Sequence, residues 1–223
     1  MNRVIIFDLD DTLFPEWQYV LSGFRAVDQY LCQSNRCAEA AFYNAAKGLF
    51  DGGSRGNIFD LALAQINLAS EKTFVADLVR VYREHKPTIT LHEDALWALD
   101  HFHSRGHTFG LISDGFLIAQ QNKFAALGIA KYFAATVFSD AFGRDAWKPS
   151  PIPYQKIMEQ IPGPPSDFIY IADNPKKDFI TARKLGWSTL HIDRPDGTYH
   201  NVQVEPAYRA DGAITTLFSL KEI

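Results

Sequence analysis

Two aspartates, Asp8 and Asp10, follow an apolar run close to the start of the chain. Residues 4–7 have the continuous apolar character of a strand buried on both faces of a parallel sheet. Residues two apart on a strand point to the same side and lie about 6.6 Å from each other, so the two carboxylates are expected to share one face. Carboxylates at a strand's carboxyl end can hold a hard cation, and one of them can attack an electrophile. A strand that ends in an ordinary acidic turn is the alternative interpretation of this stretch.

Ser113 and Lys148 are two further candidates for chemistry farther along the chain. The hydroxyl of Ser113 and the backbone N–H groups of Asp114 and the following glycine form a corner that can accept an anion. An ordinary helix N-cap is the alternative interpretation of this serine. Lys148 lies just before a predicted helix, where its charge can hold a phosphate or neutralise carboxylates, whereas a lone lysine there is commonly a solvated surface residue.

A late acidic pair, Asp173 and Asp178, completes the candidate set. Asp173 ends an apolar run, and Asp178 is expected in the first turn of the helix that follows. An acidic helix start that merely complements the helix dipole is the alternative.

These candidates are positioned by an alternation of strands and helices that begins after residue 88. Buried strands and amphipathic helices that alternate in this way predict a doubly wound parallel α/β sheet of the Rossmann type. The predicted strands cover residues 108–113, 136–139, 168–172, 189–192 and 210–214, and the predicted helices cover 93–105, 117–127, 151–160 and 175–185.

Residues 16–86 follow helical spacing almost throughout, which predicts a small α-helical cap domain inserted after the first strand. The expected domains are a catalytic core of residues 1–14 and 88–223 and a cap of residues 15–87. A glycine-rich loop interrupts the cap, and its residues Arg55 and Asn57 are candidates for determining substrate specificity. A plain helix–helix turn is the alternative for this loop.

In their order and spacing, the candidate residues resemble the motifs of the haloacid dehalogenase-like (HAD) hydrolase superfamily, and the resemblance covers essentially all 223 residues. The superfamily's signature is Asp-x-Asp-x-Thr, then a strand-terminal Ser or Thr, then a Lys, then a late acidic pair. The helical insert lies where one subgroup of the superfamily carries its cap. The matching positions here are Asp8, Asp10 and Thr12, then Ser113, then Lys148, then Asp173 and Asp178.

The resemblance implies a Mg²⁺-dependent phosphatase that hydrolyses a small phosphorylated metabolite through an aspartyl-phosphate. Asp8 would be the nucleophile and a metal ligand, and Asp10 would be the general acid and base, with its backbone carbonyl on the metal. The other implied roles are metal ligation by Asp173, phosphate binding by Ser113, Asp114 and Lys148, and orientation of Lys148 or of a metal-bound water by Asp178.

Asp114 departs from the family pattern, which usually has Asn at this position, and Ala172 stands where a glycine is common. A carboxylate beside bound phosphate repels it unless the side chain points away, which leaves a weak activity or a catalytically silent scaffold open. Two enzymes of the same superfamily are further alternatives. A 2-haloacid dehalogenase uses the equivalent of Asp8 without a metal and generally lacks the equivalent of Asp10, whereas a phosphomutase retains it.

Composition excludes several other classes of protein. A net charge of −4 and a pI near 6.0 give no electrostatic footprint for nucleic acid or an anionic membrane. No apolar run approaches the ~18 residues that span a bilayer, and the first residues lack the pattern of a signal peptide, so a cytoplasmic location is expected.

Cys32 and Cys37 have no nearby histidine and are expected to be ordinary thiols. Neither the substrate nor the oligomeric state follows from the sequence.

Overall fold

The computed structural model of the protein describes residues 2–220. The chain divides into two compact units, one formed by the residues up to Glu16 together with those from Thr90 onward, the other by Trp17–Ile89. We call them the α/β unit and the helical unit.

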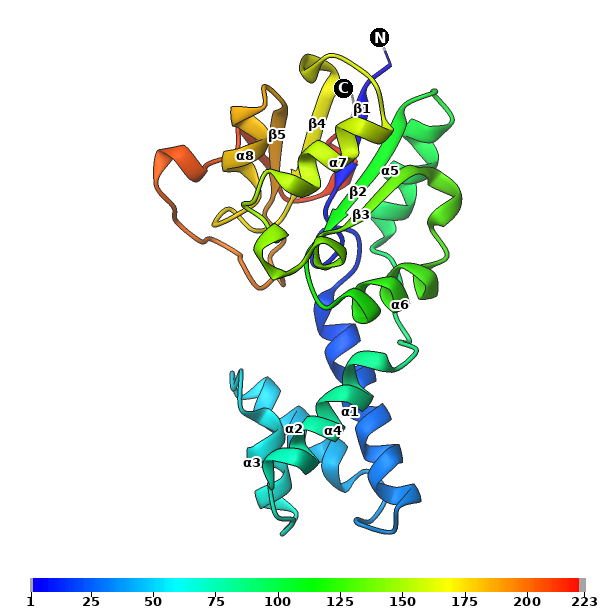
Figure 1. Ribbon diagram of the computed structural model, residues 1–223, viewed down its shortest axis with the longest axis vertical. Helices are drawn as coiled ribbons and strands as arrows, with labels where there is room; N and C mark the ends of the chain where they lie inside the picture. Colours follow the sequence, from blue (N-terminus) through cyan, green and yellow to red (C-terminus); the bar gives the residue numbers. More distant parts are fainter. Residues whose placement is uncertain (1, 221–223) are drawn as a thin grey trace. The chain divides into compact units, whose positions relative to one another are not determined.

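A six-stranded sheet with the order β3-β2-β1-β4-β5-β6 forms the centre of the α/β unit (Figure 1). All neighbouring strands pair in parallel, which confirms the predicted doubly wound fold. The first strand lies between β2 and β4, so the chain reverses its direction of winding there, and ligands bind at such a switch point in sheets of this kind. The strands are β1 (Val4–Phe7), β2 (Thr108–Ser113), β3 (Phe133–Phe138), β4 (Phe168–Ala172), β5 (Ser188–Ile192) and β6 (Gly212–Ile214).

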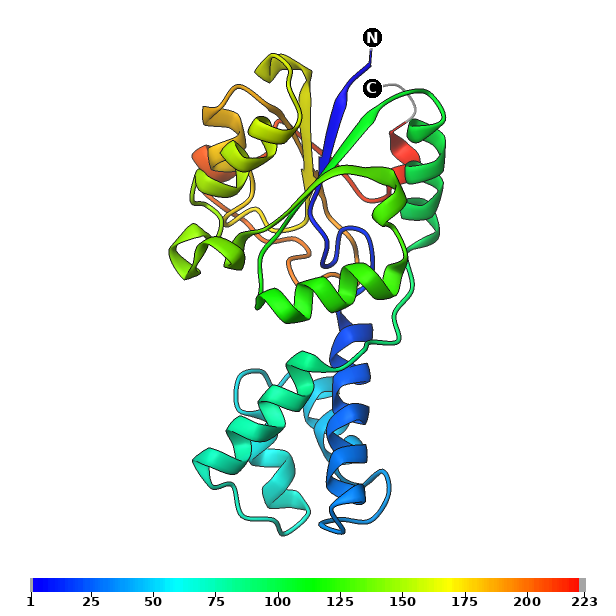
Figure 2. The same ribbon diagram turned by 45° about the vertical axis from the view of Figure 1, so that its right-hand side comes forward.

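Helices cover both faces of this sheet (Figure 2). Helices α7 (Ile152–Gln160) and α8 (Phe179–Lys184) lie on one face and α5 (Glu93–His103) on the other, while α6 (Leu117–Leu127) follows β2. Both faces of β1 and β4 are therefore buried, which explains their uninterrupted apolar sequences. The core under α7 and α8 consists of Val4, Ile6, Ile112, Ala135, Val137, Tyr154, Ile157, Ile161, Phe168, Tyr170, Ala172, Phe179, Ala182 and Trp187.

The loop after β1 differs from the sequence prediction because the strand ends at Phe7, one residue before Asp8. Asp8 and Asp10 therefore lie in the loop after the strand and not on the strand itself. The chain turns instead at Asp11, whose φ is +50°, and the carboxylate of Asp11 accepts the backbone N–H groups of Glu16 and Thr198 at 2.8 and 3.0 Å. These two hydrogen bonds stabilise a backbone conformation that residues other than glycine seldom adopt.

A second difference lies after β4, where the helix predicted over residues 175–185 begins only at Phe179. Asn174 accepts the backbone N–H of Lys176 at 3.0 Å, and the Asp178 carboxylate accepts the backbone N–H of Asn174 at 3.0 Å. Asn and Asp side chains compete in this way with the helical hydrogen-bond pattern, so residues 174–178 form a turn. Asp178 therefore precedes the helix rather than lying in its first turn.

A buried ion pair fastens the loop after β1 to the rest of the α/β unit. Arg194 binds both carboxylate oxygens of Asp94 at 3.0 and 3.1 Å, and it also donates to the carbonyl of Thr12 at 2.8 Å. Asp94 in turn accepts hydrogen bonds from Thr216 and Leu217, both at 2.7 Å. The segment that carries the first two candidate aspartates is thus held from α5 and from the C-terminal region.

The helical unit consists of the helices α1 (Glu16–Gln33), α2 (Ala41–Asp51), α3 (Ile58–Gln65) and α4 (Lys72–Glu84). The first residue of α1, Glu16, still belongs to the α/β unit. Its own core is formed by Phe24, Val27, Leu31, Phe42, Ala46, Ile58, Ala62, Leu63 and Leu78. Among residues 2–220, none of the helices combines the length and the apolar character that crossing a bilayer requires. The cytoplasmic location stays a prediction.

Candidate active site

The candidate residues gather at the carboxyl ends of the three central strands of the α/β unit. Asp8 follows β1, Ser113 is the last residue of β2, and Asp173 follows β4. Asp8 is linked to the neighbouring strand by its backbone N–H, which donates to the carbonyl of Ile171 at 2.9 Å. The sheet's switch point therefore carries polar side chains from three separate parts of the sequence.

The ammonium group of Lys148 lies at the centre of this group. It contacts the carboxylates of Asp8 and Asp178 at 2.8 Å each and donates to the hydroxyl of Tyr170 at 2.9 Å. A lysine ammonium has three N–H bonds, so each has an acceptor. The side chains of Lys148 and Asp178 are 0% exposed, which makes this a buried cluster rather than the surface lysine that the sequence left as an alternative.

Three buried carboxylates, those of Asp8, Asp173 and Asp178, have oxygens within 4.8 Å of one another. Burial raises the pKa of Asp8 to about 6, even though Lys148 lowers it. Burial, with the charges of Asp8 and Asp178, raises the pKa of Asp173 well above its usual range. Burial by itself would lower the pKa of Lys148, but the charges of Asp178 and Asp8 raise it well above its usual range.

The donor set of these three carboxylates fits a divalent cation. When all three are ionised, the single charge of Lys148 leaves an excess of two negative charges in a buried space. Clustered carboxylate oxygens are also the ligands that Mg²⁺ prefers. Asp178 shares its carboxylate with Lys148 and with the backbone N–H of Asn174, so Asp8 and Asp173 have more capacity left for a metal.

Asp10 lies outside this carboxylate group and has partners of its own. Lys123 contacts its carboxylate at 2.7 Å and Gln120 donates to it at 2.9 Å. Both partners lie on α6, and neither was identified from the sequence. A signal was present, because Gln120 and Lys123 are polar residues on the face of α6 that also buries Ala119. A polar pair on the buried side of a helix needs a buried partner.

Ser113 is fully buried, and its hydroxyl has no hydrogen-bond partner among the described residues. The N-cap interpretation of this serine is wrong, because α6 begins at Leu117 and Phe116 precedes it. A buried hydroxyl without a partner is costly unless a ligand or water satisfies it, so the structure leaves Ser113 available to an anion.

Asp114, the departure from the family pattern, is paired with a lysine that the sequence analysis left without a role. Its carboxylate contacts Lys177 at 2.8 Å and accepts the backbone N–H of Lys148 at 3.2 Å. Burial alone would raise the pKa of Asp114, but the charges of Lys148 and Lys177 lower it. The extra negative charge is thus compensated within the fold, which removes the repulsion expected if the carboxylate faced the phosphate alone.

Arg55 and Asn57 lie in the helical unit. The guanidinium of Arg55 donates to the carbonyls of Phe50 and Ser54 at 2.9 and 2.7 Å and lies over the Phe50 ring at 4.1 Å. Asn57 directly precedes α3. The hydrogen bonds of Arg55 within its own loop agree with the helix–helix turn interpretation, and a role in specificity stays a prediction.

The pairing of Asp114 with Lys177 predicts an energetic coupling. We expect Lys177→Met to lower the free energy of unfolding by about 1–3 kcal/mol, because the Asp114 side chain, 2% exposed, loses its ionic partner. Adding Asp114→Asn should recover most of the loss, since the amide carries no charge. A double-mutant cycle by urea denaturation measures this coupling, with Lys176→Met as the control at a neighbouring exposed lysine. Strictly additive effects of the two substitutions would contradict it.

Residues 5–192 match the family of haloacid dehalogenase-like hydrolases. Glyceraldehyde 3-phosphate phosphatase of Methanopyrus kandleri is 25% identical over 209 residues, which cover 91% of this chain and 88% of that protein. YfnB of Bacillus subtilis, described as a HAD hydrolase bound to magnesium, has a TM-score of 0.69 at 17% identity, over 98% of this chain and 96% of that one. A 2-haloacid dehalogenase of Pseudomonas syringae pv. tomato has a TM-score of 0.63 at 20% identity, over 99% and 96%.

The two structural likenesses show a common fold, and the family match spans most of the chain together with the four predicted motifs. The chain therefore belongs to the haloacid dehalogenase-like hydrolases.

Proposed function

We propose that this hydrolase is a Mg²⁺-dependent phosphatase that cleaves a small phosphate monoester through an aspartyl-phosphate on Asp8. The observation that carries the proposal is the buried group of Asp8, Asp173 and Asp178 around a single lysine, beside the unpartnered hydroxyl of Ser113. The carboxylates have the ligand chemistry for a divalent cation, and the serine offers a donor to an anion.

Mg²⁺ would be held by the carboxylates of Asp8 and Asp173 and by the backbone carbonyl of Asp10. When bound, it offsets the negative charge that a phosphoryl group brings next to carboxylates. The side chains around it are already fixed, because Lys148 binds both Asp8 and Asp178. This fixed arrangement avoids the cost of reorganising charges during the reaction.

Asp8 and Asp10 divide the chemistry between them. A carboxylate oxygen of Asp8 forms the bond to phosphorus while the bond from phosphorus to the ester oxygen breaks. Asp10 gives its proton to the leaving alkoxide and later takes one from the water that hydrolyses the aspartyl-phosphate. Lys123 and Gln120 hold the Asp10 carboxylate in position in the meantime. Ser113 and Lys148 would bind the phosphoryl oxygens, with Lys148 giving up one of its three present contacts, and Asp178 orients Lys148.

The excess of buried negative charge favours a phosphatase over a 2-haloacid dehalogenase. A dehalogenase uses no metal, so three clustered carboxylates beside one ammonium would remain uncompensated in it. The relative from Methanopyrus kandleri is named as a phosphatase and is similar along most of its length, which supports the same choice. A phosphomutase retains Asp10 and is separated from a phosphatase by its product.

For the substrate, we propose a small phosphorylated metabolite and take glyceraldehyde 3-phosphate, after which that relative is named, as the first one to test. The helical unit would act as the cap that excludes water from the reaction. Arg55 and Asn57 in its glycine-rich loop are the residues that we propose to determine substrate specificity.

The first test is hydrolysis of p-nitrophenyl phosphate with and without Mg²⁺. We expect activity that is lost with chelator, restored by Mg²⁺ and absent in Asp8→Asn, with inorganic phosphate as the product. The control is Asp145→Asn, which changes an exposed acid outside the site. Full activity in chelator would contradict the metal's role, and chloride release from 2-haloacids without phosphatase activity would establish the dehalogenase instead.

The second prediction separates Asp10 from Asp173. Asp10→Asn should keep the Mg²⁺ affinity near that of the wild type, because it changes a side chain and not the carbonyl. It should lower kcat by about 10²–10⁴, the usual contribution of general acid–base catalysis, and the loss should be larger for an alkyl phosphate than for p-nitrophenyl phosphate. Asp173→Asn should lose metal affinity first.

Calorimetric Mg²⁺ titration and single-turnover rates measure these effects. Equal loss of Mg²⁺ affinity in both variants, or a wild-type rate on alkyl phosphates in Asp10→Asn, would show that the role of Asp10 is wrong.

A further inference from the structure

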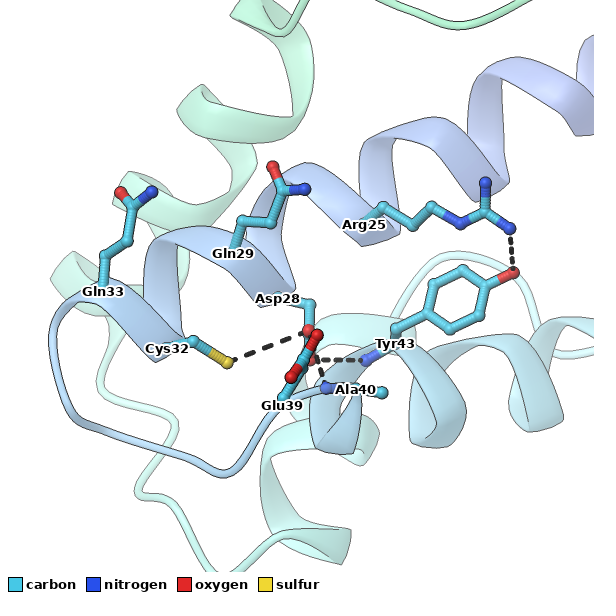
Figure 3. Close-up of a pocket in the computed structure, with 8 residues that line it drawn as sticks. All are labelled: Arg25, Asp28, Gln29, Cys32, Gln33, Glu39, Ala40 and Tyr43. Carbon is cyan, nitrogen blue, oxygen red and sulfur yellow. Dashed lines mark hydrogen bonds between the residues drawn. The ribbon is translucent and has the colours of Figure 1, made fainter.

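The helical unit contains a cavity of about 410 Å³ where α1 ends and the chain turns towards α2 (Figure 3). Its lining includes Asp28, Cys32, Glu39 and Tyr43. Asp28 and Cys32 are four residues apart on α1 and therefore lie on the same side of the helix, and Glu39 comes from the loop that follows. Nothing in the proposed phosphatase chemistry uses these residues.

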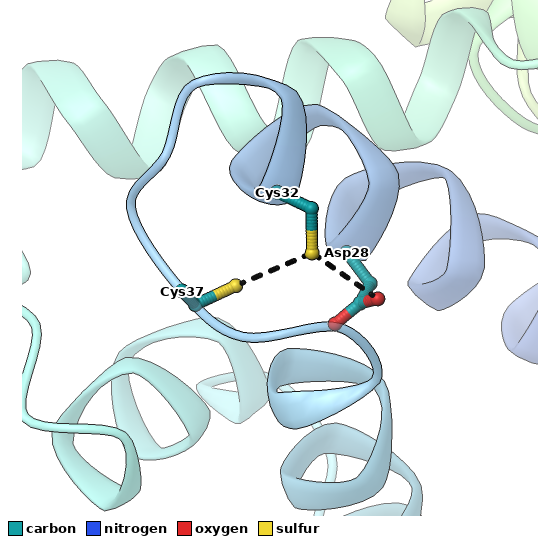
Figure 4. A group of neighbouring side chains, drawn as sticks. All are labelled: Asp28, Cys32 and Cys37. Atoms are coloured by element: carbon teal, nitrogen blue, oxygen red, sulfur yellow. Dashed lines mark hydrogen bonds between the residues drawn. The ribbon is translucent and has the colours of Figure 1, made fainter.

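Both cysteines and Asp28 converge at this place (Figure 4). The Sγ atoms of Cys32 and Cys37 are 3.8 Å apart, and the Sγ of Cys32 lies 3.9 Å from a carboxylate oxygen of Asp28. One ligand atom from each of the three residues lies within 4.8 Å of the others. The sequence separates Cys37 from α1 by a loop, and only the fold brings its sulfur to the helix.

The distance between the two sulfurs matches that of a tetrahedral thiolate site, while the distance from Cys32 Sγ to the Asp28 oxygen is somewhat longer than the ideal value. Two sulfurs that each lie about 2.3 Å from one tetrahedral Zn²⁺ are separated by about 3.8 Å. A carboxylate oxygen at about 2.0–2.2 Å from the same ion lies about 3.5 Å from each sulfur when the angles are ideal. A disulfide, in contrast, requires the sulfurs to approach to about 2.05 Å, and the carboxylate would not take part in that bond.

Asp28 is already fixed in the position that a ligand requires. It is 6% exposed, and its carboxylate oxygens accept the backbone N–H groups of Ala40 and Tyr43 at 2.9 and 3.1 Å. A carboxylate oxygen has lone pairs beyond the one that accepts a backbone N–H, so these hydrogen bonds leave room for a cation. They also orient the carboxylate, as the outer partners of metal ligands commonly do.

The charges around the sulfurs favour a cation. The negative charges of Asp28 and Glu39 both act on the thiol of Cys32, and both residues line the same cavity. Of the arginines nearby, Arg25 donates to the hydroxyl of Tyr43 at 3.4 Å, away from the sulfurs (Figure 3). Arg36, in the loop between the two cysteines, lies over the ring of Phe74 at 4.5 Å.

We propose that Asp28, Cys32 and Cys37 form a binding site for one thiophilic divalent cation of the Zn²⁺ type, with the fourth position open to Glu39 or water. The two thiols each lose a proton on binding, so two protons are released for each ion. The bound ion would connect the end of α1 to the loop before α2. This site takes a soft cation through sulfur and differs in ligand type from the carboxylate group of the α/β unit.

The site is tested on the full chain, reduced with a phosphine and titrated with Cd²⁺ in an excess of Mg²⁺. We expect an ultraviolet thiolate-to-Cd²⁺ charge-transfer band that saturates at one equivalent and is removed by Zn²⁺. Cys32→Ser and Cys37→Ser should each weaken binding by at least about 100-fold, because loss of even an outer partner of a metal ligand costs about 10–100-fold. Asp8→Asn is the matched control and should leave the band unchanged, since it alters the other carboxylate group.

A second measurement needs no variant and therefore does not depend on the folding of one. Zn²⁺ should slow the alkylation of Cys32 and Cys37 in the wild-type chain, because ligation removes the free thiolates. Absence of a charge-transfer band at millimolar Cd²⁺, a band that persists in both serine variants, or alkylation at the same rate with and without Zn²⁺ would each overturn the proposal.

Discussion

Three buried carboxylates compete for one ammonium group where the central strands of the α/β unit end. Asp8 and Asp178 both contact Lys148, while burial raises the pKa values of Asp8 and Asp173. A protein accepts such an uncompensated group only when protons or a cation balance the charge. The arrangement of the α/β unit supports this group, because the parallel sheet brings the ends of β1, β2 and β4 together and Arg194 anchors the loop after β1.

The same principle of charge compensation explains the partners around this group. Asp114 replaces the asparagine that the family usually has, and Lys177 neutralises it at 2.8 Å. Asp10 is held by Lys123 at 2.7 Å, so its charge too is balanced by a nearly buried lysine. Asp10 and Asp114 thus each have a lysine partner, whereas Asp8, Asp173 and Asp178 share Lys148 and carry an excess of negative charge at the proposed metal position.

Much of this arrangement could be predicted from the sequence because strands of a parallel sheet deliver their last residues to one edge. The apolar runs before Asp8 and Asp173 marked buried strands, and the observed sheet confirms them. The course of the chain at residues 8–11 and 174–178 did not follow from periodicity, because there aspartate and asparagine side chains bind backbone N–H groups in place of regular structure.

The lysine partners could not be assigned from the sequence for a different reason. Lys123 lies 113 residues from Asp10 and Lys177 lies 63 residues from Asp114, so the pairing depends on how helices dock on the sheet. Periodicity indicates which face of α6 is buried, but not which carboxylate that face meets. The convergence of Cys37 with Asp28 and Cys32 has the same origin, since a loop of unknown course separates them in the sequence.

The proposed mechanism requires Asp8 to carry the phosphoryl group during the reaction. Rapid acid quench of a single turnover, followed by borohydride reduction and peptide mapping, measures this directly, because reduction converts an aspartyl-phosphate to homoserine. We expect homoserine at position 8 alone, formed on the timescale of turnover in the presence of Mg²⁺. Steady turnover of a phosphate monoester with residue 8 recovered only as aspartate, or homoserine at another position, would contradict it.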